Sequence, residues 1–508
     1  MLVQEFLEKS ARRLPEKVAL VCDGQRLTYA EIDAQANRLA NALRASGLKR
    51  GDRVVICLPN GCPLAVSIFA ALKADGVFVV VNHTTKPKKL TYLLNNCQAA
   101  ALIAPGDVSH AVWELGIGTP PLQTAVLTSP VPSEIESIRV LSYDAIQEHQ
   151  PSVRPLTTNI ERDLACLIYT SGSTGEPKGV MSDHSNVDFV TSSIISYLGN
   201  KEDDVVLDVL PLSFDYGLYQ LLMTFKFGGT LVLEKSFAFP AAVLRQVERE
   251  RVTGFPGVPT MFAVLLRMDL TPFDLRSLRY ITNTAAALHP AHIRELRAKF
   301  TWATLYSMYG LTETKRTLYL PPDQLDSRPR SVGIAIPGTE VWLEDDEGRR
   351  LGPNQIGELV VRGPHVMRGY WGDHAATSSR FRRGPIPGEC VCHTGDLFKM
   401  DDEGYFYFVA RRDDIIKTRG EKVAPKEVEA VLLELKGVVE AAVVGVPDPI
   451  LGEAVKAFVV ADAVKLTESD VIRYCREHLE ELLVPTHVEF CRELPKTPSG
   501  KIAGTALK

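Results

Sequence analysis

Apolar and polar positions follow two alternating periods along most of the chain, one typical of helices and one typical of strands. Near the start, runs at 18–22 and 25–28 flank Asp23-Gly24 and predict a hairpin, and Thr28-Tyr-Ala-Glu31 predicts a capping box that opens a helix toward Ala45. Helical stretches then separate three apolar runs, at 53–58, 77–81 and 99–103. Strands joined by helices are expected to form a parallel sheet, so the pattern predicts a layered α/β protein.

The pattern changes in the second half of the chain. From 331 to 408, short alternating runs such as 358–362 lie between turns at 345–348 and 401–404, which predicts a β-rich module. Beyond Arg411 the pattern predicts a helix, two strands and a second helix, at 426–435, 439–446, 454–460 and 468–483. These elements form an α+β unit of ordinary domain size. We therefore expect a large domain at 1–411 and a small domain at 412–508.

Composition and charge exclude several classes of protein. The 508 residues, 45% hydrophobic and 23% charged, exclude a single small domain. The 57 Lys and Arg against 62 Asp and Glu leave a net charge of −5, too balanced for nucleic acid or an anionic membrane as the main partner. We expect no secretory signal at the start and no membrane span. The most apolar long run, 65–81, is interrupted by Lys73, Asp75 and Gly76 and predicts a buried helix followed by a buried strand.

The nine cysteines are scattered through the chain, which favours reduced thiols in a cytoplasmic protein over a disulfide framework. Cys390, Cys392 and His393 form the one tight cluster. A structural zinc site needs four ligands in paired spacings, and no second pair of cysteines or histidines stands nearby. We therefore interpret these residues as parts of a strand and assign no metal to the cysteines.

The segment LIYTSGSTGEPKGV, at 167–180, carries the strongest chemical signal. An apolar strand runs into glycines and hydroxyl side chains and ends near Lys178. Glycines let the backbone approach a ligand closely, and consecutive amides and hydroxyls can surround phosphate oxygens. The spacing of Gly172, Gly175 and Lys178 differs from that of a Walker P-loop. The segment therefore predicts phosphate binding, with a flexible surface turn as the alternative.

Six further motifs follow in order along the chain. They are YSMYGLTET at 306–314, SVG at 331–333, GELVVRGPHVMRGYW at 357–371, HTGDL at 393–397, RRDDIIKTRGEKVAPKEVE at 411–429 and LPKTPSGKI at 494–502. Together with the phosphate-binding segment, they resemble the adenylate-forming superfamily, which holds acyl-CoA synthetases, peptide-synthetase adenylation domains and luciferases. The resemblance covers nearly the whole chain.

The resemblance implies a reaction in which a carboxylate is joined to the α-phosphate of ATP, pyrophosphate leaves, and the acyl group passes from AMP to a thiol. Because one anion attacks another, Mg²⁺ and fixed cations should dominate the catalysis. The ATP-binding residues that the resemblance implies are Thr170, Ser171, Gly172, Ser173, Thr174, Gly175, Lys178, Asn283, Thr284, Ala285, Tyr309, Gly310, Thr312, Asp396 and Arg411.

Particular roles follow from the same resemblance. The hydroxyls from Thr170 onward and Lys178 would hold the β- and γ-phosphates, Tyr309 would stack on adenine, and Thr312 would contact the α-phosphate. Asp396 would accept hydrogen bonds from the ribose hydroxyls, with Arg411 nearby. The catalytic residues would be Thr170, Glu313 as the Mg²⁺ ligand, and Lys501 as a mobile lysine that bridges the carboxylate and the α-phosphate.

The resemblance also implies movement of the small domain. Asp413 would be the hinge about which this domain rotates, and Gly420 would leave room for a narrow pantetheine arm when the thiol attacks. Two departures from the family pattern affect the nucleotide site. Ala410 stands where a glycine usually precedes Arg411, and Asn283-Thr-Ala-Ala-Ala287 replaces a glycine-rich segment beside adenine.

The acid-binding residues that the resemblance implies are Phe214, Asp215, Tyr216, Tyr219, Met308, Arg316 and Thr317. Phe214-Asp215 resembles the amino-acid-activating members, in which the aspartate pairs with the substrate ammonium. A buried carboxylate needs a partner, and an internal arginine such as Arg316 would serve equally well. The sequence leaves both interpretations open.

These observations predict an ATP-dependent, AMP-forming acid–thiol ligase that is cytoplasmic and takes CoA or a separate carrier protein as acyl acceptor. One alternative is a stand-alone amino-acid adenylation enzyme that loads a peptidyl carrier protein. A luciferase-type oxidoreductase would use the same first step and then oxygen. A binding protein that kept the fold without the activity is the remaining alternative.

Overall fold

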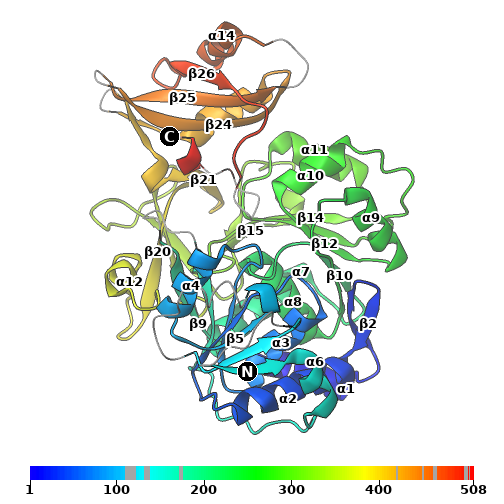
Figure 1. The fold of residues 1–508 in the computed structure, drawn as a ribbon. Coiled ribbons are helices and arrows are strands. Elements are labelled where there is room, and N and C mark those ends of the chain that lie inside the picture. Colours follow the sequence, from blue (N-terminus) through cyan, green and yellow to red (C-terminus); the bar gives the residue numbers. More distant parts are fainter. Residues whose placement is uncertain are drawn as a thin grey trace.

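The computed structural model describes residues 1–108, 122–130, 138–170, 176–418, 421–448, 451–461, 466–496, 502 and 504–507. The strands of these residues form four sheets. Three sheets belong to a large mixed α/β domain, and the fourth belongs to a small domain at the C-terminal end of the chain (Figure 1). No helix within the described ranges is both long and apolar enough to cross a membrane.

A seven-stranded sheet forms the first lobe of the large domain. Its spatial order is β7 (Arg139–Ser142), β6 (Thr124–Leu127), β5 (Ala99–Ala104), β3 (Arg53–Ile56), β4 (Val77–Val80), β8 (Leu164–Thr170) and β9 (Lys178–Asp183). All neighbours are parallel except β8 and β9, which form an antiparallel pair. The three apolar runs predicted as parallel strands are confirmed as β3, β4 and β5. The helices of this lobe are α2 (Tyr29–Ala45), α3 (Cys62–Lys73), α4 (Pro87–Asn96) and α6 (Tyr143–His149).

A nine-stranded sheet forms the second lobe. Its order is β16 (Ile334–Ala335), β15 (Leu318–Leu320), β14 (Thr304–Tyr309), β13 (Tyr280–Asn283), β12 (Gly254–Gly257), β10 (Val205–Asp208), β11 (Thr230–Leu233), β1 (Val18–Cys22) and β2 (Gln25–Thr28). The predicted hairpin and capping box are confirmed, because Asp23 and Gly24 adopt φ of 49° and 77° and Thr28 caps α2. The helices are α1 (Gln4–Arg13), α7 (His184–Leu198), α8 (Asp215–Phe227), α9 (Pro240–Arg249), α10 (Pro259–Arg267) and α11 (Pro290–Lys299).

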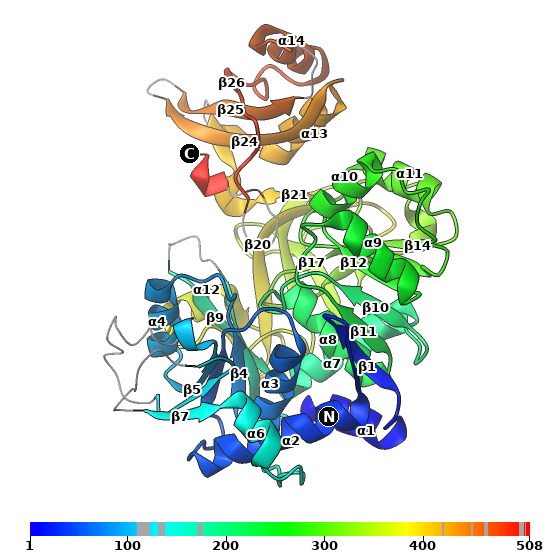
Figure 2. The same ribbon diagram turned by 45° about the vertical axis from the view of Figure 1, so that its right-hand side comes forward.

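The two lobes share one hydrophobic core. Ile56 and Phe78 of the seven-stranded sheet belong to the same buried cluster as Leu231 of the nine-stranded sheet and Leu222 of α8. Figure 2 shows α7 and α8 near the junction of the two lobes. Burial of this apolar surface against both sheets fixes α8 in place.

The β-rich module predicted between 331 and 408 is confirmed. β17 (Glu340–Glu344), β18 (Ile356–Arg362), β19 (Phe381–Arg383), β20 (Cys390–Met400) and β21 (Phe406–Arg411) are antiparallel, with the short helix α12 (His374–Arg380) beside them. Cys390, Cys392 and His393 lie in β20, in agreement with their interpretation as strand residues. The module is joined to the first lobe by a bridge between Val180 and Tyr370.

The small domain contains β22 (Ile416–Thr418), β23 (Glu421–Val423), β24 (Val438–Asp448), β25 (Gly452–Ala461), β26 (His487–Phe490), α13 (Pro425–Glu434) and α14 (Glu468–His478). The predicted end of the last helix is wrong. It ends at His478, and a turn then places Leu483 and Val484 in the core of the domain. Burial of these two side chains in the small-domain core therefore accompanies the earlier end of the helix.

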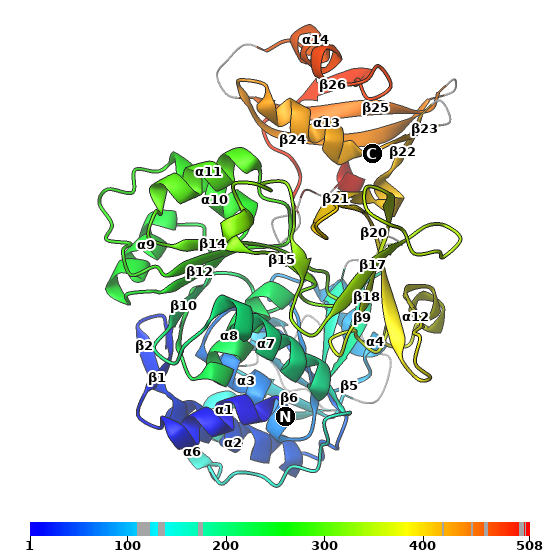
Figure 3. The ribbon, with the colours of Figure 1, turned by 180° about the vertical axis from the view of Figure 1, so that it is seen from behind.

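The small domain lies over the large domain, above β14, β15 and β20 (Figures 1 and 3). An ion pair between Arg330 and Glu434, with an N–O distance of 3.1 Å, connects the two domains. The predicted boundary after Arg411 stays a prediction. It falls between the last strand of the β-rich module and the first strand of the small domain.

Candidate active site

The phosphate-binding segment joins the antiparallel strands β8 and β9. Thr170 ends β8 and is paired with Lys178 at the start of β9, so the expected loop starts and ends at one point of the sheet. The Lys178 ammonium lies 5.5 Å from the ring centre of Tyr370 and 3.8 Å from a carboxylate oxygen of Asp373. Seven predicted site residues lie outside the described residues, namely Ser171, Gly172, Ser173, Thr174, Gly175, Gly420 and Lys501.

The YGLTET motif forms the tight loop between β14 and β15. The backbone N–H of Thr317 donates to Tyr309 O at 2.9 Å, and that of Lys315 donates to Leu311 O at 2.7 Å. A Cβ atom on Gly310 would lie only 1.9 Å from Lys315 O, so the loop closes only around a glycine. Lys315 itself adopts a left-handed φ of 59°. The loop therefore holds Thr312 and Glu313 in a fixed position.

Glu313 has the surroundings expected of a metal ligand. Its side chain is buried, and its Oε1 accepts a hydrogen bond of 2.6 Å from the Tyr370 hydroxyl. Its Oε2 accepts no hydrogen bond from the described residues. Tyr370 thus lies between Glu313 and Lys178, and burial raises the pKa of Tyr370, which keeps its hydroxyl a donor. A buried carboxylate with one free oxygen beside a phosphate-directed lysine fits Mg²⁺ bound to a nucleotide.

Tyr309, Asp396 and Arg411 come together where the same loop begins. The Tyr309 hydroxyl donates to Asp396 Oδ2 at 2.5 Å, and Arg411 Nε lies 3.6 Å from Asp396 Oδ1. Asp396 and Arg411 are cross-strand neighbours in β20 and β21. Phe398 packs its ring edge-to-face with Tyr309 at 4.9 Å. Burial raises the pKa of Asp396, and the charge of Arg411 opposes this effect.

The segment that replaces the glycine-rich pattern follows β13. The Asn283 amide donates to Ala286 O at 3.0 Å, while its buried Oδ1 has no hydrogen-bond partner among the described residues. Thr284 is also buried, and Ala285 adopts a left-handed φ of 75°. The chain thus retains a conformation natural to glycine, at a cost of about 1–2 kcal/mol for a residue with a side chain. These residues lie at the carboxyl end of a parallel strand, where ligands bind in α/β sheets.

The predicted acid-binding residues gather around the start of α8 and the loop after β14. The Tyr216 hydroxyl bonds to Thr282 O at 2.9 Å, and the Arg316 guanidinium lies 4.5 Å from the Tyr216 ring centre. Met308 accepts a hydrogen bond from a neighbouring tyrosine hydroxyl at 2.9 Å. Asp215 and Tyr219 lie in the first turns of α8 after Phe214, which is the N-cap residue, and Thr317 is fully buried.

Asp215 is buried, with 7% of its surface exposed. Arg316 forms no ion pair with it; its guanidinium instead donates to Lys315 O at 3.1 Å.

The predicted hinge residue Asp413 lies in a short 3-10 helix, Arg412–Asp414, between β21 and β22. Asp413 is exposed, whereas the neighbouring Arg412 bonds to Glu358 of β18 at 3.1 Å and pairs with Asp346. The position suits a hinge because few contacts hold Asp413 itself. Its role as a hinge stays a prediction.

Three residues near the site were not predicted from the sequence. Tyr370 lies inside the GPHVMRGYW motif, and Lys315 follows the YGLTET motif, so both could have been found there. Arg380 at the end of α12 belongs to no motif. Burial would lower the pKa of Arg380, but the charges of Glu313 and other neighbours raise it, so the guanidinium stays charged near the metal-binding position.

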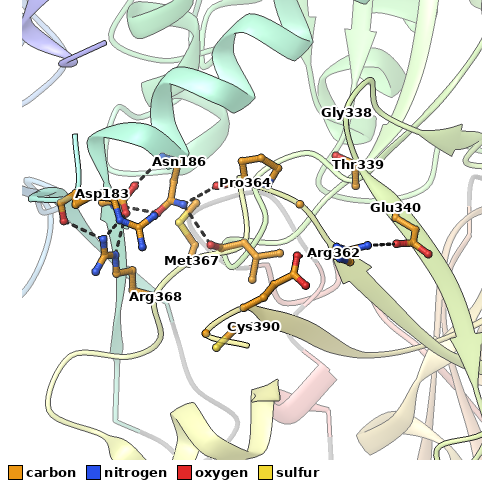
Figure 4. Close-up of a pocket in the computed structure, with 15 residues that line it drawn as sticks. Asp183, Asn186, Gly338, Thr339, Glu340, Arg362, Pro364, Met367, Arg368 and Cys390 are labelled. Atoms are coloured by element: carbon orange, nitrogen blue, oxygen red, sulfur yellow. Dashed lines mark hydrogen bonds and ion pairs between the residues drawn. The ribbon is translucent and has the colours of Figure 1, made fainter. Parts of the chain in front are cut away.

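A surface groove of about 730 Å³ lies behind the loop that carries Met367 (Figure 4). The backbone N–H of Met367 donates to Glu313 O at 3.1 Å, so this loop separates the groove from the predicted site. Several charges in the groove are paired with one another. Arg362 bonds to Glu340 at 2.9 Å and to Glu389 at 2.8 Å, as Figure 4 shows in part. The groove contains none of the predicted site residues.

Two family models match the chain. The model described as AMP-binding enzyme matches residues 7–371, and the model described as AMP-binding enzyme C-terminal domain matches residues 427–501. The chain is 31% identical to the long-chain-fatty-acid–CoA ligase of Bacillus subtilis (strain 168), over 98% of this chain and 93% of that protein. It is 35% identical to the feruloyl-CoA synthase of Amycolatopsis sp, over 97% of this chain and 96% of that protein.

A solved structure agrees with these relatives. The O-succinylbenzoate coenzyme A synthetase MenE from Bacillus subtilis, in complex with ATP and a magnesium ion, superposes with a TM-score of 0.85 and 28% identity. The match covers 98% of each chain. This chain therefore belongs to the adenylate-forming superfamily of AMP-binding enzymes, within which it groups with the ATP-dependent, AMP-forming acid–CoA ligases.

Proposed function

We propose that this enzyme activates a carboxylic acid with ATP and transfers the acyl group to CoA. One observation carries the proposal. Around the loop after β14, one set of linked side chains consists of Glu313, Tyr370 and Lys178, and a second set consists of Tyr309, Asp396 and Arg411. The first set suits a metal and phosphates, and the second suits a ribose and a base. The arrangement therefore supports a nucleotide bound with its phosphates toward Glu313.

In the first half-reaction, a carboxylate oxygen of the acid attacks the α-phosphorus, and the bond to the β-phosphate breaks. Lys178 stabilises the negative charge of the departing pyrophosphate, together with the predicted hydroxyls from Thr170 onward. Glu313 holds Mg²⁺, which when bound neutralises phosphate charge. Tyr370 orients the Glu313 carboxylate through its hydrogen bond, and Asp396 positions the ribose. Lys501 remains the predicted lysine that bridges the carboxylate and the α-phosphate.

In the second half-reaction, a thiolate attacks the acyl carbon and AMP leaves. We propose that Asp413 is the hinge for the rotation that precedes this step and that Gly420 borders the thiol channel. The names of the relatives support CoA as the acceptor. A separate carrier protein is the second candidate acceptor, favoured by the resemblance of Phe214-Asp215 to amino-acid-activating enzymes.

We also propose a cytoplasmic location. All nine cysteines are unpaired, seven of them buried, which agrees with a reducing compartment.

Acid-dependent exchange of labelled pyrophosphate into ATP tests the first half-reaction. We expect exchange with at least one acid of a set of fatty, aryl and amino acids, and loss of exchange in Glu313→Gln. Mass analysis of the products with CoA offered alone tests the acceptor. Adenylate without thioester would favour the carrier protein, and an absence of exchange with every acid would contradict the proposed function.

A further inference from the structure

Lys315 carries a buried ammonium group for which the described residues provide no partner. Only 1% of its surface is exposed, and its Nζ forms neither a hydrogen bond nor an ion pair within the described ranges. Its Nζ lies 5.7 Å from the ring centre of Tyr219. The Tyr219 hydroxyl is also buried and without a hydrogen-bond partner there. Buried polar groups normally find partners, so two unused donors side by side point to a ligand.

These two donors lie among the predicted acid-binding residues. Lys315 is on the loop that carries Glu313, it adopts a left-handed backbone conformation, and its carbonyl oxygen lies close to Gly310. Tyr219 is in the α8 turn that follows Asp215. Burial lowers the pKa of Lys315, and the charge of Asp215 opposes this effect, although the two side chains form no ion pair.

The charges in this region are unbalanced. Lys315 and Arg316 are two cations. Glu313 bonds to Tyr370 and is the predicted metal ligand. Of the carboxylates named here, this leaves Asp215 to balance the two cations. An amino group on the substrate would be repelled by both cations. An oxygen atom that accepts a hydrogen bond, whether neutral or anionic, would use the free donors.

We propose that Lys315, assisted by the Tyr219 hydroxyl, is a specificity-determining residue that binds an oxygen acceptor on the acyl group of an acid without an amino group. The acceptor is a hydroxyl, a keto oxygen or a second carboxylate. The proposal rests on the proposed acid–CoA ligase function. It makes Lys315 the electrostatic partner of Asp215, in place of a substrate ammonium.

Straight-chain acids of increasing length test the proposal with the full-length enzyme. For each chain length, the unsubstituted acid is compared with acids that carry one substituent. The substituent is a hydroxyl, an amino group or a second carboxylate, placed on the second carbon or at the chain end. A keto group on the second carbon is also included. The readout is kcat/KM for AMP formation in the presence of CoA. We expect at least one oxygen-bearing acid to exceed its unsubstituted parent about tenfold or more, and amino acids to fall below that parent.

Lys315→Met keeps the length of the side chain and removes the charge and the donors. We expect the preference for oxygen-bearing acids to fall at least tenfold in this variant, and Lys315→Gln to retain part of it for hydroxy and keto acids but not for dicarboxylic acids. Tyr219→Phe keeps the ring beneath Lys315 and should reduce the preference less. If Lys315→Met fails to fold, the substrate profile of the wild-type enzyme and of Tyr219→Phe decides.

Preference of the wild-type enzyme for amine-bearing acids would overturn the proposal. An equal loss of kcat/KM for substituted and unsubstituted acids in a folded Lys315→Met variant would do the same. Silence with every acid contradicts the proposed function itself. Activity that is indifferent to oxygen substituents contradicts only the role of Lys315.

Discussion

Gly310→Ala should show how strictly the loop after β14 is fixed. The new Cβ would lie 1.9 Å from Lys315 O, against an ordinary carbon–oxygen contact of about 3.3 Å, so the backbone at Lys315 must move by about 1.4 Å. Overpacking of this kind costs about 1–3 kcal/mol of stability. The same loop carries Thr312 and Glu313, and a misplacement of about 1 Å in a site can cost about 100-fold in rate. We expect kcat/KM for AMP formation to fall about 100-fold.

Gly352→Ala is the matched control, because a Cβ atom added at Gly352 would have no other atom within 4 Å and the φ of this residue is not left-handed. We expect this variant to keep its stability to within about 0.5 kcal/mol and to keep its activity. Thermal unfolding and steady-state kinetics of both variants provide the measurement. Near-normal activity in a folded Gly310→Ala enzyme would refute the argument that the loop must be tight for catalysis.

Three further changes test other parts of the structure. Tyr370→Phe removes the hydrogen bond to Glu313 and should lower kcat about tenfold or more, with little change in thermal stability; unchanged kcat would contradict the orienting role. Burial raises the pKa of Asp396, so the affinity of the enzyme for AMP, measured by calorimetry, should fall as the pH drops. The Asp396→Asn variant should bind AMP at least tenfold more weakly and without this pH dependence. Burial would raise the pKa of Asp204, but its hydrogen bonds, first of all the one from Arg279, lower this pKa below the ordinary aspartate value. The ionised Asp204 therefore stabilises the folded protein fully at a pH above the ordinary aspartate pKa. This stabilisation is lost as the pH falls through the lowered pKa. Asp204→Ala should therefore lose about 2 kcal/mol of unfolding free energy at neutral pH and less in acid, and an equal loss at both would refute the pairing.

Much of the fold could be predicted because the relevant signals are local. Parallel strands buried on both faces are continuous apolar runs, and the hairpin at Asp23-Gly24 and the cap at Thr28 depend on neighbouring residues. The end of the last helix was missed because the residues after His478 leave the helix and place Leu483 and Val484 in the small-domain core. The spacing of apolar residues along this segment does not show where the helix ends.

Residues of the candidate site could be predicted from the sequence where they belong to a motif. They could not be predicted where only folding brings them into the site. Tyr309 and Asp396 are about ninety positions apart, and only their motifs indicated that they meet. Arg380 has no such signal. The sequence carries no signal for the burial of Lys315, because that burial results from a loop closed by Gly310 and from a helix a hundred positions earlier.

The burial of α8 on all sides limits how this enzyme can acquire new substrates. Residues from Asp215 to Phe225 are all buried, and the helix packs into the core shared by both lobes. A substitution that reshapes the acid pocket from α8 therefore also changes the packing that holds the lobes together. Arg316, on the loop opposite, stacks on one tyrosine and is tied to few other groups. Directed evolution of acid selectivity should accordingly change Arg316 before it alters the helix.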